Sequence, residues 1–124
     1  MQSIKSYTDI PQSKKLAEIL PPETADMYFE KGIRDNYKEA FGNYADMWIS
    51  ENMLGFKTIP CWSLAALLGI LPNESDIVKG QSDGKDGKYM CTVGYKNDIL
   101  STFSDSPIDA CVEMIIKLYE LNLL

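Results

Sequence analysis

The sequence of 124 residues contains no histidine and only one arginine, Arg34. Without histidine the chain has neither a Ser-His-Asp nor a Cys-His triad, and it lacks the commonest metal ligand. Eleven of its twelve basic residues are lysines, so bidentate guanidinium contacts to phosphate or guanine depend on Arg34 alone. These two shortages exclude much of the usual equipment for catalysis and for nucleic-acid recognition.

The chain is also short of positive charge, with 18 acidic against 12 basic residues and a formal net charge of −6. Neutralising phosphates requires clustered lysine and arginine, so this balance disfavours nucleic acid as a partner. The acids are interleaved with lysines, which favours a solvated surface over imitation of DNA.

Long apolar runs are absent as well, because the longest, residues 64–71, reaches about half of a membrane span. Residues 1–10 have no secretion-signal core. The three cysteines, Cys61, Cys91 and Cys111, are widely spaced among apolar neighbours, which predicts buried free thiols in a reducing compartment. We therefore expect a cytoplasmic protein with no membrane association, no metal site and no cofactor.

The glycine-rich segment 80–88 resembles two ligand-binding loops only superficially. Gly80 and Gly87 are separated by six residues, whereas a Walker loop needs four between its glycines. Asp83 does not begin a calcium loop, because position three would be Lys85 and position twelve would be Gly94. The segment is therefore expected to be a turn between strands.

The apolar fraction of 45% supports a single α+β domain over residues 1–124. Three helices are predicted. Asp9 to Gln12 has the form of a capping box and opens the first, which ends before Pro21. Residues 60–72 form an apolar, buried helix that starts at Pro60, and Ser106 caps a helix that runs to about residue 120.

Strands are expected at residues 25–30, 44–50, 56–59, 75–79, 88–95 and 99–104. The polar segment 31–43 is either a long loop or a short helix. Short turns between the strand runs favour antiparallel pairing, so the predicted fold is a mostly antiparallel sheet of about four to six strands. With the three helices it forms a helix–sheet–helix sandwich.

Four stretches carry a resemblance: QSKKLAEIL at 12–20, ADMYF at 25–29, PCWSLAALL at 60–68 and DSPIDACVEMII at 105–116. They resemble uncharacterised small proteins encoded by prophages and mobile elements of gut bacteria. The last stretch also resembles the closing helix of phage alpha-beta-alpha sandwich domains. The resemblance implies an accessory protein of a mobile element with helix–sheet–helix layering, and it implies no activity, substrate or site residues.

The aromatic residues are unevenly distributed, since eight of the thirteen fall between Tyr28 and Trp62. They either fill a core or form an interaction surface, where tyrosine and tryptophan are favoured anchors. The candidate binding residues are Tyr37, Phe41, Tyr44 and Trp48, and Tyr37 and Phe41 fit best because their segment is otherwise polar. The favoured function is a non-enzymatic accessory or protein-interaction domain of a prophage or mobile element, with a protein partner or self-association.

The alternative is a small-molecule-binding or carboxylate-based enzyme domain. Its pocket would be lined by Asp26, Glu30 and Asp46, because paired carboxylates perform acid–base chemistry. Cys61 at a helix start is a further nucleophile candidate, but a structural role is favoured because it lacks a histidine partner. No catalytic residue is assigned.

Overall fold

The computed structural model describes residues 5–80 and 88–124. The chain divides into two compact units, unit 1 (residues 1–6 and 67–124) and unit 2 (residues 7–66). The described residues form four α-helices and two separate three-stranded antiparallel sheets. The α+β class and the antiparallel pairing are confirmed. The six strands of the described residues form two sheets where one was predicted, and the α-helices number four where three were predicted. A single domain over residues 1–124 stays a prediction.

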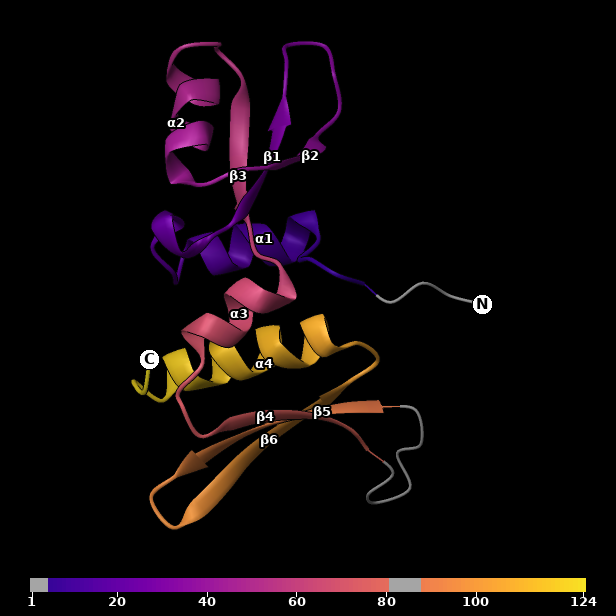
Figure 1. Cartoon of the computed structure of the whole chain (residues 1–124), viewed down its shortest axis with the longest axis vertical. Coiled ribbons are helices and arrows are strands. Elements are labelled where there is room, and N and C mark those ends of the chain that lie inside the picture. Colours follow the sequence, from indigo (N-terminus) through magenta and orange to yellow (C-terminus); the bar gives the residue numbers. More distant parts are fainter. Residues whose placement is uncertain (1–4, 81–87) are drawn as a thin grey trace. The chain divides into compact units, whose positions relative to one another are not determined.

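Unit 2 contains one sheet with strand order β2-β1-β3, drawn in purple and magenta in Figure 1. Its elements are α1 (Ile10–Ala17), η1 (Pro22–Thr24), β1 (Met27–Lys31), β2 (Lys38–Phe41), α2 (Tyr44–Asn52) and β3 (Lys57–Cys61). The central strand β1 pairs antiparallel with both neighbours. Strand β2 therefore lies at an edge of the sheet.

The two faces of this sheet carry different helices, because successive strand residues point to opposite sides. On one face Met27, Phe29, Ile59 and Cys61 form a buried cluster, and Ile10 at the start of α1 packs against it. The other face carries Tyr28 and Glu30, both of which contact α2. Unit 2 thus has a helix on each face of its sheet.

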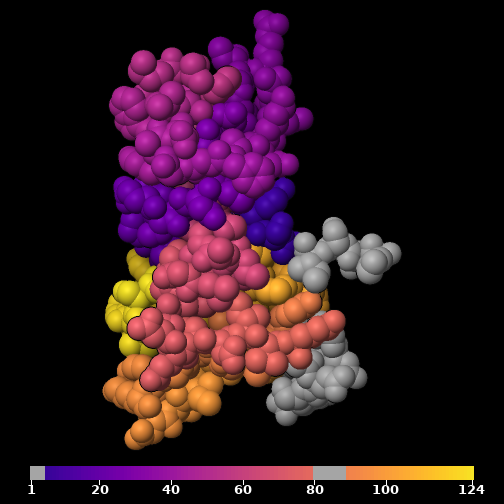
Figure 2. Space-filling view, in the orientation of Figure 1, coloured from indigo at the N-terminus to yellow at the C-terminus, as the bar shows by residue number. Residues whose placement is uncertain are grey.

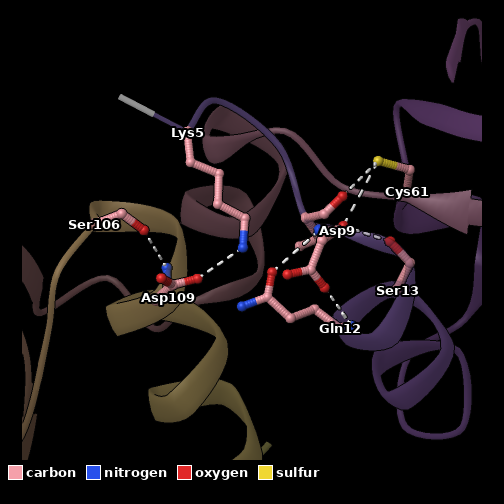
Figure 3. A network of polar contacts seen from close by, with 8 residues as sticks. Lys5, Asp9, Gln12, Ser13, Cys61, Ser106 and Asp109 are labelled. Carbon is pink, nitrogen blue, oxygen red and sulfur yellow. Dashed lines mark hydrogen bonds and ion pairs between the residues drawn. The ribbon is translucent and has the colours of Figure 1, made fainter. Parts of the chain in front are cut away.

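Helix α1 begins as the sequence predicts. The Asp9 carboxylate accepts a hydrogen bond from the Gln12 amide at 2.8 Å, and the Gln12 side chain accepts one from the Asp9 amide at 3.1 Å. Figure 3 shows this reciprocal pair beside Ser13 and Cys61. The capping box is confirmed, and Leu16 and Leu20 are buried.

Residues 44–50 form helix α2 rather than the predicted strand. Asn43 and Asp46 make a second capping box, with hydrogen bonds of 3.1 Å and 3.0 Å between side chains and amides. Gly42 allows this close approach, because an added Cβ would lie 2.7 Å from an Asp46 carboxylate oxygen. The alternating pattern misled the prediction because apolar side chains occur on both sides of the helix.

Two other segments differ from expectation. Residues 31–43 are neither a long loop nor a helix, because Lys38–Phe41 forms β2 and pairs with β1 in a hairpin. The segment that starts at Pro60 is not all helix, because Pro60 and Cys61 end β3 and Ser63 precedes α3 (Leu64–Ile70). The Ser63 hydroxyl caps this short helix by accepting from the Ala66 amide at 3.2 Å. Only Leu67 of α3 is fully buried, so the prediction of a heavily buried helix is also wrong.

Unit 1 contains a three-stranded meander of order β4-β5-β6 with α4 packed on it, drawn in orange and yellow in Figure 1. Its elements are β4 (Ser75–Gly80), β5 (Lys88–Tyr95), β6 (Asp98–Ser104) and α4 (Pro107–Glu120), close to the predicted ranges. The Ser106 hydroxyl caps α4 by accepting from the Asp109 amide at 3.1 Å, as predicted. Residues 81–87 of the expected glycine-rich turn lie outside the described residues. No helix in the described ranges is long and apolar enough to cross a membrane.

Candidate interaction surface

Helix α2 is buried on one side and exposes apolar side chains on the other. Met47 and Ser50 are its buried residues. Its outer half, together with the C-cap residue Met53, exposes four large apolar side chains, here called the α2 apolar face: Tyr44, Trp48, Ile49 and Met53. Tyr44 and Trp48 lie one turn apart, as do Ile49 and Met53, so neighbouring members can contact one ligand together. Trp48 is 48% exposed, which is unusual for so large an apolar residue.

Phe41 ends the edge strand β2, just before the link to α2. It lies opposite Met27 of β1, on the face of the sheet that carries the buried cluster. Phe41 nevertheless remains 81% exposed. This side chain is therefore available to a ligand.

Tyr37 is placed differently from the other three predicted binding residues. It is half-buried and packs against the cluster of Met27, Phe29, Ile59 and Cys61. The Lys31 ammonium lies 5.3 Å from the centre of its ring. Tyr37 thus contributes to the core of unit 2, whereas Phe41, Tyr44 and Trp48 are exposed.

Sequence reasoning missed Ile49 and Met53, which share the outer half of α2 with Trp48. Leu54, directly after the helix, is exposed as well. The signal was present in the sequence, because the order Asn43 to Asp46 has the same capping-box form as Asp9 to Gln12. A helix started at Asn43 would have placed Ile49 and Met53 one turn apart on one side.

Asp26, Glu30 and Asp46, the acids of the alternative hypothesis, each take part in a different structural contact. Asp26 accepts hydrogen bonds from the Ser63 amide at 2.9 Å and from the Ser63 hydroxyl. Asp46 caps α2, as described above. Glu30 accepts from the Ser50 hydroxyl at 2.9 Å and so joins β1 to α2.

Glu30 also lines a hollow of about 80 Å³ at the end of the sheet. Neither Asp26 nor Asp46 belongs to its lining. The hollow is much smaller than typical small-molecule sites, which hold about 300–1,000 Å³. The structure therefore does not bring the three carboxylates together in that hollow.

Cys61 is the last residue of β3 and does not start a helix, and it is fully buried. Its thiol donates to the Thr8 carbonyl at 3.4 Å, and the Thr8 hydroxyl lies 3.6 Å from its sulfur. Figure 3 shows this thiol directed at the segment that precedes α1. Burial raises the pKa of Cys61, so the thiol stays protonated and is a poor nucleophile.

Cys91 of β5 and Cys111 of α4 are both buried free thiols in unit 1, and they interact with each other. Thr102, the cross-strand partner of Cys91, donates to the carbonyl of Ala110 at 2.7 Å, which brings this part of the sheet against α4. The hydrogen bond with Cys91, together with burial, raises the pKa of Cys111. The predicted buried free thiols are thus observed. No group of three potential metal-ligating side chains occurs in the described part of the chain.

Comparisons with known proteins found no match to this chain. No protein-family model matches the chain, and neither the curated proteins nor the solved structures contain a significant match. The resemblance to prophage and mobile-element proteins stays a prediction.

Proposed function

We propose that unit 2 is a protein-interaction module that binds its partner through the α2 apolar face and Phe41. The role is non-enzymatic and accessory, and the resemblance noted above points to a prophage or mobile element as its setting. The observation that supports this proposal is the exposure of Trp48 and three further apolar side chains on the outer half of α2. The inner side of the same helix is already packed, so folding of unit 2 does not account for them.

The residue types suit a binding surface. Tryptophan and tyrosine are enriched among the residues that dominate binding energy at interfaces. A buried aromatic side chain removes about 150–250 Å² from water, so covering the exposed part of Trp48 removes about 100 Å². At about 25 cal/mol per Å² this burial alone contributes about 2–3 kcal/mol.

The charges beside the α2 apolar face indicate what kind of partner fits. Glu51 lies one turn beyond Trp48, and Asp46 lies one turn before Ile49, so an acidic residue borders each side of the face. Both side chains are exposed. Complementary potentials favour a partner whose apolar contact residues are bordered by lysine or arginine.

The proposal is tested by photo-crosslinking in the native cell, with a photoreactive amino acid in place of Trp48. The matched control carries the same amino acid in place of Tyr119, an exposed aromatic residue of α4. We expect one protein to be captured from position 48 and not from position 119. Capture of the same proteins at both positions would contradict the proposal.

The contribution of the acidic residues beside the α2 apolar face is tested by binding to the captured partner. Glu51→Lys should weaken binding, whereas Glu113→Lys, at an exposed position of α4, should leave the affinity unchanged. A cross-link between two copies of this chain would contradict a partner with a basic border, because both copies would present acids there.

A further inference from the structure

One end of the unit 2 sheet places two lysines directly opposite each other. Lys31 at the end of β1 and Lys57 at the start of β3 are cross-strand partners. They lie on the same face as Phe29 and Ile59, two pairs further along the two strands, because the Glu30–Thr58 pair lies between. Like charges in directly opposed positions destabilise a sheet, so this arrangement needs a physical explanation.

Among the residues that the structure describes, neither lysine forms an ion pair with a carboxylate. Ion pairs are found elsewhere, at Lys5–Asp109 and Lys15–Glu18. The ring of Tyr37 beside Lys31 offers partial compensation, because an aromatic face attracts a cation. Lys57 is exposed and has no such neighbour among these contacts.

A hollow of about 160 Å³ lies between these two lysines and the loops at the same end of the sheet. Its lining consists of Lys31, Gly32, Ile33, Gly55 and Lys57. No carboxylate lines it, in contrast to the neighbouring hollow that contains Glu30 and Asp35. Both charged side chains that line the 160 Å³ hollow are thus cationic, although the protein as a whole is acidic and Lys31 also borders the neighbouring hollow.

The hollow is open to solvent. Ile33, at the tip of the β1–β2 hairpin, is 97% exposed, and Figure 2 shows this tip projecting beyond the rest of unit 2. Gly55 on the opposite side has a φ of +74°, and no atom lies within 4 Å of the position of an added Cβ. The wall formed by Gly55 therefore leaves free space for a ligand.

We propose that this hollow binds a phosphate-class dianion, with the ammonium groups of Lys31 and Lys57 holding its oxygens. A phosphate monoester carries about −1.5 to −2 charges at neutral pH, which matches two lysines better than a single carboxylate does. Lysine binds phosphate as a point charge, so no arginine is required. The bound dianion also removes the repulsion between the two opposed lysines.

The surroundings favour one phosphate group over a nucleic acid. Residues 7–66 contain nine acidic and six basic residues, and four of the bases occur at this end of the sheet: Lys31, Arg34, Lys38 and Lys57. An extended polyanion would meet the acidic remainder of the unit. A single phosphate monoester, either free or as a lipid headgroup, needs only the hollow.

The first test titrates the full chain with inorganic phosphate at constant ionic strength while amide chemical shifts are recorded. We expect saturable shifts centred on Ile33, Gly55 and Lys57. Lys57→Gln removes one charged contact and should raise the phosphate Kd by about tenfold. Lys14→Gln, which removes the same charge from the exposed side of α1, should leave the Kd unchanged. Equal effects of the two substitutions, or shifts spread over all lysines, would overturn the proposal.

A second measurement distinguishes the two sources of the phosphate group. The chain is mixed with phosphatidylcholine vesicles that either contain or lack phosphatidic acid. Binding only to phosphatidic-acid vesicles, with loss in Lys57→Gln and competition by inorganic phosphate, assigns the site to a headgroup. Saturable phosphate binding without vesicle binding assigns it to a free monoester. Absence of both kinds of binding refutes the site.

Discussion

Two phenylalanines of unit 2 provide a matched test of which aromatic residues form its core. Phe29 of β1 and Phe41 of β2 lie on the same face of neighbouring strands. Phe29 is 5% exposed and belongs to the buried cluster, whereas Phe41 is 81% exposed. Replacing each with alanine removes the same atoms from two environments, so the two free energies of unfolding should differ strongly.

The magnitudes follow from the two exposures. Phe29→Ala leaves a cavity in the cluster and should lower the free energy of unfolding by about 3–5 kcal/mol. Phe41 has lost only about a fifth of its accessible area, or about 40 Å² of an aromatic side chain, so Phe41→Ala should cost about 1 kcal/mol. The expected difference is therefore about 2–4 kcal/mol.

Urea denaturation followed by tryptophan fluorescence measures both values. Both tryptophans, Trp48 and Trp62, belong to residues 7–66, so the signal reports on unit 2. Equal losses for the two variants would refute the assignment of Phe41 to the exposed edge and would remove it from the binding surface.

Two further predictions concern the buried contacts of unit 2. Thr8→Val deprives the buried Trp62 amide of its acceptor at 3.1 Å and the Ser13 hydroxyl of its partner at 2.7 Å, so urea denaturation should show a loss of about 1–3 kcal/mol. Burial raises the pKa of Cys61 above its ordinary 9.0, so stability is complete below about pH 9 and falls as the pH rises toward the folded-state value. Cys61→Ala should lose less stability than the unmodified chain as the pH rises from about 9 to about 11, and an identical pH dependence would contradict this assignment.

The helix boundaries that sequence reasoning located correctly have a local cause. Asp9 with Gln12, and Ser106 with Asp109, are three residues apart and satisfy amides within one turn. Such contacts depend on neighbouring residues only, so the sequence contains them in full. Asn43 and Asp46 have the same form, but the alternating apolar pattern of residues 44–50 favours a strand. The sequence prediction therefore missed helix α2.

The errors arose where distant contacts or exposure decide the structure. The edge strand β2 is polar at Lys38 and Glu39, and only its pairing with β1 makes it a strand. The outer half of α2 is apolar although it is exposed, so the hydrophobic periodicity of a half-buried helix is absent. Division into two sheets depends on which strands pair, and local patterns do not specify that choice.

The candidate sites also divide into residues that the local sequence indicates and residues that only distant contacts bring together. The aromatic concentration between Tyr28 and Trp62 points to Tyr37, Phe41, Tyr44 and Trp48 from the sequence alone. It does not show that Tyr37 packs against the core. The opposition of Lys31 and Lys57, and the meeting of Cys91 with Cys111, depend on sheet register and helix packing. Residues 20 or more positions apart carry no local signal of such proximity.

The central claim is that the α2 apolar face binds a protein partner. Its most direct test is the equilibrium affinity of the purified chain for the protein captured from position 48. Trp48→Ala should raise the Kd by at least about tenfold, since truncating a central interface tryptophan costs about 2 kcal/mol or more. Tyr119→Ala, an equally exposed aromatic residue outside the face, should leave the Kd unchanged. Equal affinities for Trp48→Ala and the unmodified chain would contradict the account.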